Sequence, residues 1–315
     1  MILNIYTWNL LNPQPHISQM SWKAFSPSNN QSFEIATIDY KRYKLYRINI
    51  LYKIIKYWIS QSQNNNSNAT IICLQEVNLD LLEKLKLLVN NKQISWSNDT
   101  DSNHRVTIVI NCEIINNKEI NFNKSNNSDI ESSLIGRSIL LSNIKIKNKI
   151  YQCFNVHMHW SWSLVQLDYV ATIIKNNIDE LNPFIIVGDF NKPIDLLESF
   201  MDQFDCIQFN KYECKLSLEL CNSYTSMLTH IKDSLKSDKI SNPKKGIIDH
   251  ILLSSDFITD KNTKLKIISN VFKYKIFYNF KKIILINNLT SEKWINKRKN
   301  KDISDHKPVK LEIAI

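Results

Sequence analysis

The chain of 315 residues lacks features that define several classes of protein. No apolar run reaches the roughly 18 residues that a membrane-spanning helix needs, so a membrane protein is not expected. The six cysteines are scattered and form no CxxC pair, which argues against a zinc site. The first residues have no basic start, and Asn4 and Asn9 interrupt their apolar stretch, which is not typical of a secretory signal. We therefore expect an intracellular protein of a reducing compartment, the cytoplasm by default.

Arginine is also scarce, because only five of the 40 basic residues are arginines. The formal net charge is +10 and the isoelectric point is about 9.1, a balance that suits a polyanionic partner. Asparagine, isoleucine and lysine are abundant throughout, as in proteins from strongly AT-rich genomes. A solvated lysine-rich surface therefore explains the charge about as well as a nucleic-acid-binding patch does.

Glycine is the scarcest of these residues, with three in the whole chain. Glycine tolerates backbone conformations and close contacts that other residues do not. Each retained glycine is therefore expected to serve backbone geometry or close approach. Two of them, Gly188 and Gly246, lie beside short polar motifs.

What the chain does contain is a pattern of alternating secondary structure. Apolar residues make up 43% of it, enough for a sizeable core. Short apolar runs predict strands over 2–8, 71–75, 106–110, 137–146, 150–157, 184–187, 248–254 and 309–313. Helical spacing predicts helices over 40–60, 79–89 and 164–178. The asparagine-rich stretches 63–68 and 116–128 are predicted to be surface loops. The whole pattern, 1–315, fits one α/β domain with two sheets packed face to face and helices outside.

Six short segments place an acid, an amide or a histidine at the end of an apolar run. They are TWN at 7–9, LQEV at 74–77, NVHMHW at 155–160, GDFN at 188–191, IDHI at 248–251 and SDHKPV at 304–309. A strand that ends in a polar residue delivers that side chain to the rim of its sheet. Any one segment is more often a solvated strand end or a turn, but six of them together indicate one shared site.

The order of these segments resembles that of the endonuclease/exonuclease/phosphatase superfamily, from Ile2 to Ile313. The resemblance implies a four-layer α/β sandwich with two mostly antiparallel sheets, and a metal-dependent phosphodiesterase. HMHW at 157–160 followed by Gln166, IDY at 38–40 before a long helix, and KGIID at 245–249 are similar to a deadenylase and 2′,5′-phosphodiesterase subgroup. Phe190 departs from the leucine expected in that subgroup.

The resemblance implies a Mg²⁺ site, in which Mn²⁺ could substitute. Glu76 is the principal expected ligand, with Asn9 beside it, and Asp305 is a second candidate. Carboxylate oxygens are the hard ligands that Mg²⁺ prefers. Whether one or two metal ions bind is left open, because Asp189 and Asp305 could share one.

The resemblance also implies the catalytic roles. Asp189 would orient and deprotonate the attacking water, Asn191 would hold the scissile phosphate and that water, and His157 would donate to a phosphate oxygen. Asp249 and His306 would form a dyad that assists attack or stabilises the pentacovalent phosphorus. A carboxylate that accepts a hydrogen bond from one ring nitrogen fixes the tautomer of the imidazole.

Substrate contacts are expected from His159 and Trp160, although packing at a strand end explains that pair about equally well. Arg47 could face the phosphate backbone or be a helix-surface charge. The segment 272–286 interleaves aromatics with lysines, which suits single-stranded nucleic acid but is more simply an amphipathic strand pair.

These features together favour hydrolysis of RNA from its 3′ end, with RNA rather than DNA as the partner. The alternatives are a DNA endonuclease or end-repair phosphodiesterase, and, with less support, a phosphoesterase for lipid headgroups, inositol phosphates or dinucleotides.

Overall fold

The protein is described here from a computed structural model. The described residues are 1–10, 33–97, 104–122, 138–159, 162–192, 197–204, 206–207, 249–254, 257, 266–267 and 309–315.

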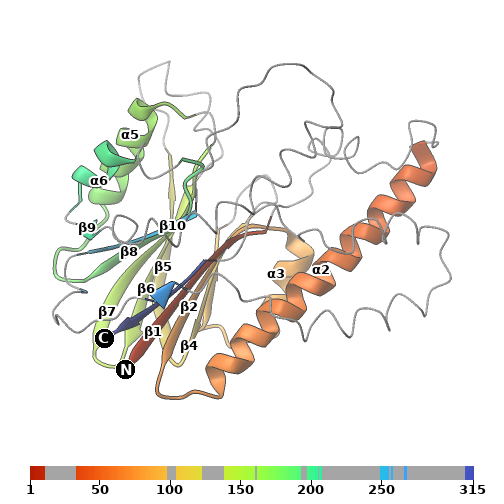
Figure 1. The fold of residues 1–315 in the computed structure, drawn as a ribbon, viewed down its shortest axis with the longest axis horizontal. Coiled ribbons are helices and arrows are strands. Elements are labelled where there is room, and N and C mark those ends of the chain that lie inside the picture. Colours follow the sequence, from red (N-terminus) through yellow and green to blue (C-terminus); the bar gives the residue numbers. More distant parts are fainter. Residues whose placement is uncertain are drawn as a thin grey trace.

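Six described strands form sheet A, in the order β11-β12-β1-β2-β4-β3. Their bounds are β1 Ile2–Asn9, β2 Ala69–Val77, β3 Ile94–Trp96, β4 His104–Ile110, β11 Lys266–Ile267 and β12 Val309–Ala314. β1 and β2 lie parallel, and every other neighbouring pair is antiparallel. The two termini therefore lie together, since β12 runs back alongside β1 (Figure 1).

Sheet B repeats this plan with six described strands in the order β5-β6-β7-β8-β10-β9. Their bounds are β5 Glu113–Asn121, β6 Ser138–Ile146, β7 Lys149–His157, β8 Phe184–Asp189, β9 Cys206–Ile207 and β10 Asp249–Ser254. β7 and β8 are the one parallel pair of neighbours, with antiparallel partners around them. Each sheet thus contains a parallel pair whose strands finish at the same edge.

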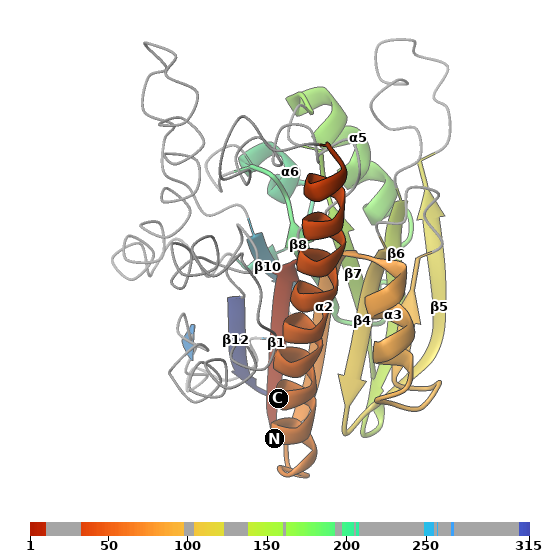
Figure 2. The same ribbon diagram turned by 90° about the vertical axis from the view of Figure 1, so that its right-hand side faces the viewer.

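Helices cover the outer face of each sheet, which confirms the expected four-layer sandwich (Figures 1 and 2). α2 (Phe33–Gln63) and α3 (Leu79–Lys86) lie on sheet A, and α5 (Leu164–Lys175) and α6 (Glu198–Asp202) lie on sheet B. α5 begins with a capping box in which Ser163 and Gln166 bond each other's backbone N–H groups. No described helix combines the length and the apolarity needed to cross a membrane.

The sheets are held together by an apolar layer between them. Alternate residues of the central strands point into it, among them Leu3, Ile5, Ile71, Ile185 and Val187, all fully buried. The intervening residues face the helices and form two outer cores. The strands are therefore buried on both faces, which is why they read as continuous apolar runs in the sequence.

Four sequence predictions need correction. The predicted loop 116–128 contains part of β5, because its backbone pairs with β6 while most of its side chains are exposed, so no apolar pattern marks it. IDY at 38–40 lies inside α2 and not before it. The helices predicted over 79–89 and 164–178 end three residues early, at Lys86 and Lys175.

Gly188 confirms the expectation for a retained glycine. Its φ is +144°, in the region that favours glycine, and a Cβ there would lie 2.0 Å from the carbonyl oxygen of Val156 on β7. β7 and β8 can therefore approach closely, directly before His157 and Asp189, only because residue 188 has no side chain.

Gly188→Ala is accordingly expected to destabilise the fold by about 3 kcal/mol or more, the combined scale of an overpacked core and a strained backbone. Urea unfolding followed by circular dichroism measures this change. Asn117→Ala, on an exposed position of β5, is the control and should shift the free energy of unfolding by less than about 0.5 kcal/mol. Equal stability of Gly188→Ala and wild type would contradict the close approach.

Candidate active site

The candidate site lies where the two parallel strand pairs end. Asn9 pairs with Gln75 across sheet A, and His157 pairs with Asp189 across sheet B. Asp249, the first residue of β10, lies opposite Asp189. The polar ends of four strands and the beginning of a fifth are therefore brought to one rim of the sandwich.

Along the inner faces, side chains change from apolar to polar toward this rim. On β1 the buried residues Leu3 and Ile5 are followed by Thr7 and Asn9, and on the other central strands the same step leads to an amide, an acid or a histidine. The inner positions nearest the rim are Thr7 and Asn9, Gln75, Asn155 and His157, and Asp189. The apolar inner residues of each strand thus hold the sheets together, while the last inner residues before the rim supply the polar side chains of the site.

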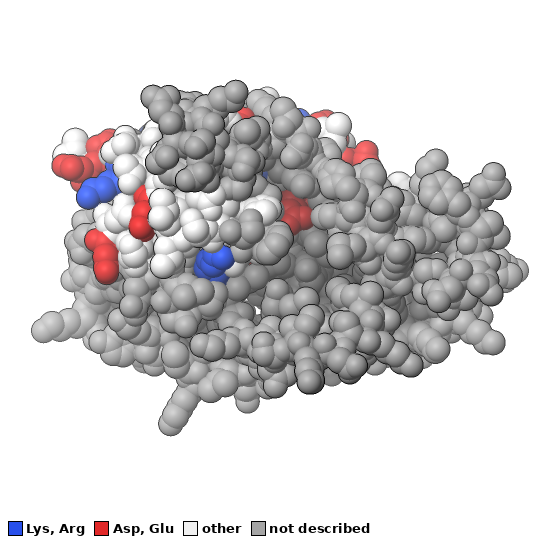
Figure 3. Space-filling view, turned by 90° about the horizontal axis from the view of Figure 1, so that it is seen from above, with Lys and Arg blue, Asp and Glu red and all other residues white. Residues whose placement is uncertain are grey.

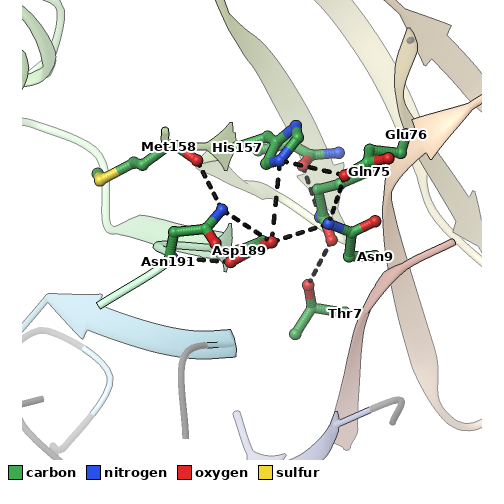
Figure 4. Close-up of polar contacts among 9 residues, drawn as sticks. Thr7, Asn9, Gln75, Glu76, His157, Met158, Asp189 and Asn191 are labelled. Carbon is green, nitrogen blue, oxygen red and sulfur yellow. Dashed lines mark hydrogen bonds and ion pairs between the residues drawn. The ribbon is translucent and has the colours of Figure 1, made fainter. Parts of the chain in front are cut away.

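Glu76 reaches the site through a break in this alternation. A register shift between Leu74 and Val77 opposes two residues of β2 to one of β4, which is a β-bulge. Glu76 lies in it with a φ of +54°, a left-handed conformation that is uncommon for a residue with a side chain. Strict alternation after Gln75 would turn residue 76 toward the helices, whereas the bulge directs Glu76 to Asn9 and His157 (Figure 4).

Asn9 joins the carboxylates of the two sheets. Its Nδ2 donates to Oε1 of Glu76 at 3.0 Å and to Oδ2 of Asp189 at 2.8 Å (Figure 4). The Nε2 of His157 lies 3.4 Å from the same oxygen of Glu76 and 3.8 Å from that of Asp189. Two acidic groups can share this nearly buried space because the amide and the imidazole both face them.

The turn that follows β8 fixes the side chain of Asp189 by donating hydrogen bonds to its oxygens. It is 1% exposed, and its Oδ1 accepts from the backbone N–H of Asn191 at 2.7 Å. The side-chain amide of Asn191 donates to Oδ2 of Asp189 at 3.2 Å and to the carbonyl oxygen of Met158 at 2.7 Å. Asn191 has a φ of +52°, which asparagine adopts more readily than most residues.

A second amide pair crosses between the sheets beneath these groups. Nε2 of Gln75 donates to Oδ1 of Asn155 at 2.8 Å, and both residues are fully buried. Asn155 then donates to the carbonyl oxygen of Val106 at 3.0 Å, and Thr7 donates to Oε1 of Gln75 at 3.3 Å. This bridge joins the strand of Glu76 to the strand of His157 one or two residues before each of them.

The donor set of the rim suits a hard divalent cation. Glu76 offers a carboxylate with its side chain 12% exposed, and the amide of Asn9 turns its nitrogen to the two acids. Mg²⁺ characteristically takes one or two carboxylates and retains several waters. Within the described residues, no three His, Cys, Asp or Glu side chains form a ready-made metal site.

The structure brings together five of the predicted residues, namely Asn9, Glu76, His157, Asp189 and Asn191. Asp249 is 7% exposed and adjoins them by its pairing with Asp189.

His159 is partly exposed, and its carbonyl oxygen accepts from the backbone N–H of Trp162 at 3.2 Å. Arg47 belongs to α2, with its side chain outside the described part. The predictions for Trp160, Asp305, His306 and 272–286 lie outside the described residues.

Sequence reasoning missed the supporting amides Gln75 and Asn155. Both stood inside motifs that it selected, LQEV and NVHMHW. The available signal was that each amide occupies a position where the alternation of its strand predicts a buried apolar residue. A buried amide needs a hydrogen-bond partner, so such a position indicates a polar contact in the interior.

Comparison with known proteins identifies the fold. No protein-family profile and no curated protein matches the sequence. Among solved structures, an endonuclease/exonuclease/phosphatase family protein from Leptotrichia buccalis is 15% identical, with a TM-score of 0.51, over 99% of this chain and all of its own. A mannosyl-6-phosphatase from Bacteroides thetaiotaomicron is 15% identical over the same shares, with a TM-score of 0.56. A truncated TDP2 from Caenorhabditis elegans is 12% identical, with a TM-score of 0.55, over 100% of this chain and 98% of its own.

The chain therefore has the fold shared by these endonuclease/exonuclease/phosphatase structures, as the sequence motifs implied. The resemblance to the deadenylase-like subgroup stays a prediction from the sequence.

The amide bridge gives a prediction about stability. Asn155→Leu should cost about 2–4 kcal/mol, because it leaves the amide of Gln75 and a backbone acceptor buried without this partner. The double change Gln75→Leu with Asn155→Leu should cost less than the sum of the two single changes. Denaturant unfolding of the three variants measures both effects, and strictly additive losses would argue against a direct bridge.

Proposed function

We propose that this protein is a divalent-metal-dependent phosphoesterase that hydrolyses phosphodiester bonds. The observation that supports the proposal is that Glu76 and Asp189, from different sheets, accept from the one amide of Asn9. His157 and Asn191 lie against these acids. Hydrolysis of a phosphodiester needs an oriented water, a group to accept its proton, and positive or hydrogen-bonding groups for the phosphate oxygens. This rim offers a group for each need.

Asp189 is the proposed base. Three N–H groups, from Asn9 and Asn191, fix its oxygens, so the carboxylate is held in one orientation for a water. His157 lies beside both acids with Nε2 directed at them, where a proton on that nitrogen can be shared with a phosphate oxygen.

Asn191 has a role in this arrangement that the sequence did not suggest. Both of its amide N–H groups are engaged within the protein, one with Asp189 and one with the carbonyl oxygen of Met158. We therefore assign it first to orienting Asp189. Donation to a phosphate oxygen would require it to release one of these bonds.

Glu76 would hold the metal ion, with the amide oxygen of Asn9 as a neighbouring ligand and Asp305 as the second carboxylate suggested by the sequence. A bound Mg²⁺ supplies charge neutralisation at the phosphate oxygens and the leaving group.

The proposed dyad of Asp249 and His306 is supported by strand order. β12 begins at Val309, which pairs with Thr7, so the chain enters sheet A beside the end of β1 that carries Asn9. Two residues, Lys307 and Pro308, separate His306 from Val309, so the Cα atoms of His306 and Val309 lie at most about 11 Å apart. Asp249 lies at the same rim through its pairing with Asp189.

RNA is the proposed substrate, on the strength of the HMHW motif at 157–160, whose first residue, His157, is the last residue of β7. Seen from above, the described residues visible on this face carry acidic and basic side chains in small separate groups (Figure 3). The charge visible on this face therefore does not itself favour one nucleic acid over another. The similarity in fold to a mannosyl-6-phosphatase makes a sugar phosphate the second substrate class to test.

The first test is of metal and substrate together. Purified protein with Mg²⁺ or Mn²⁺ should shorten single-stranded RNA that ends in adenosines, and excess EDTA should abolish the activity, because the site presents hard oxygen ligands. Mixed RNA, single-stranded DNA, abasic duplex DNA and a hexose 6-phosphate are compared in parallel on a gel and by phosphate release.

Full turnover in excess EDTA would exclude the metal assignment. Faster cleavage of either DNA than of any RNA would replace the substrate with DNA, and phosphate release from the sugar phosphate alone would make the protein a phosphomonoesterase.

The second test replaces single charged groups. Asp189→Asn and Glu76→Gln should each lower kcat by about 10²–10⁴, the usual scale for an acid–base or electrostatic group. The shape of each side chain is preserved, so circular dichroism should be unchanged. Glu180→Gln, an exposed acid away from the rim, is the matched control and should retain wild-type kcat. Near-normal turnover in both site variants would refute the proposed site.

A further inference from the structure

His250 is a buried histidine on the face of sheet B opposite to the candidate site. It is the second residue of β10 and pairs with Gly188. Successive strand side chains point to opposite faces, so Asp249 faces the rim while His250 faces the helices. His250 is 1% exposed, and its ring meets the ring of Phe190 edge-on, with centroids 5.4 Å apart and planes at 76°.

The same ring also bonds the turn that follows β8. Its Nε2 lies 2.9 Å from the carbonyl oxygen of Lys192. A carbonyl oxygen can only accept, so Nε2 carries the proton and donates. His250 therefore contacts Phe190 and Lys192, the two residues on either side of Asn191.

Asn191 is held from the other side by the site itself. Its amide bonds Asp189 and the carbonyl oxygen of Met158, and its backbone N–H bonds Asp189. Its φ of +52° is sparsely populated, and such a conformation persists only where the surroundings determine it. Phe190 adds a second anchor by packing edge-on against Phe200 of α6, with centroids 5.7 Å apart.

We infer that His250 is a positioning residue, which fixes the turn 190–192 from behind so that Asn191 orients Asp189. The inference rests on the proposed function in that Asp189 is the base whose orientation matters. The necessary group is the N–H donor of His250 directed at Lys192, and not the bulk or aromaticity of the ring.

The test compares variants that differ in this donor. His250→Leu removes it, and His250→Asn keeps a polar group too short to reach Lys192. His250→Gln extends an amide N–H to about the position of Nε2. The first two should lower kcat about 10- to 100-fold with little change in KM, since misplacement of a catalytic group costs on that scale. His250→Gln should recover most of the loss.

Leu252→Ala is the matched control for lost packing. Leu252 lies on the same strand, faces the same core and is 1% exposed, but it does not bond the turn. This change should lower the melting temperature without lowering kcat of the folded protein. The double variant His250→Leu with Asn191→Ala should lose no more than Asn191→Ala alone, because both changes release the same group.

Amide hydrogen exchange of 190–192 provides a readout that does not depend on activity. Exchange should accelerate in His250→Leu and His250→Asn, and should stay at the wild-type rate in His250→Gln and Leu252→Ala. Unchanged exchange in the first two variants would overturn the inference, as would equal loss of kcat in His250→Leu and His250→Gln.

The failure of the proposed function has a different signature. If Asp189→Asn keeps wild-type turnover, the base is wrong whatever His250 does. If Asp189→Asn is inactive and His250→Leu retains full kcat, only the positioning role fails.

Discussion

Two carboxylates from different sheets share one amide nitrogen, and much of the surrounding structure serves to keep them together. Nδ2 of Asn9 lies 3.0 Å from Glu76 and 2.8 Å from Asp189. Two acids in a space this buried repel each other unless donors or a cation face them. The amide of Asn9 and the neighbouring His157 reduce this repulsion within the protein, and a hard divalent cation would reduce it further. The need for positive charge beside two carboxylates and the proposed phosphodiester hydrolysis therefore both favour a divalent cation at this place.

This arrangement depends on unusual backbone. Glu76 and Asn191 both adopt left-handed conformations, each at a cost of about 1–3 kcal/mol, and Gly188 permits a strand approach that no other residue allows. The apolar layer between the sheets and the two outer cores offset that cost. The amide pair of Gln75 and Asn155 connects this scaffold to the strained segment, because it fixes β2 against β7 directly beneath Glu76 and His157.

The sequence predicted all five residues that the site brings together, but strand alternation explains the place of only some of them. Asn9, His157 and Asp189 close apolar runs, so their place at a rim follows from alternation. The orientation of Glu76 does not, because the bulge arises from pairing with β4, a segment distant in the chain. β5 was missed for a related reason, since a strand held by backbone bonds to β6 needs no apolar side chains. The predicted roles of Asp305 and His306 remain predictions.

The two sheets also divide the proposed work between them. Sheet A supplies Glu76 and Asn9, the proposed ligands of the metal ion, whereas sheet B supplies Asp189 and His157, the groups proposed for the water and the phosphate, and Asn191 holds Asp189 from the turn after β8. The distance between the two sets is set by how the sheets pack, and not by any single loop. Alternating strands give each sheet a polar rim and an apolar interior, so the same contacts that stabilise the sandwich fix that distance. A change in the inter-sheet layer near the rim would therefore alter catalysis without touching a catalytic group, whereas the outer cores would affect it mainly through stability.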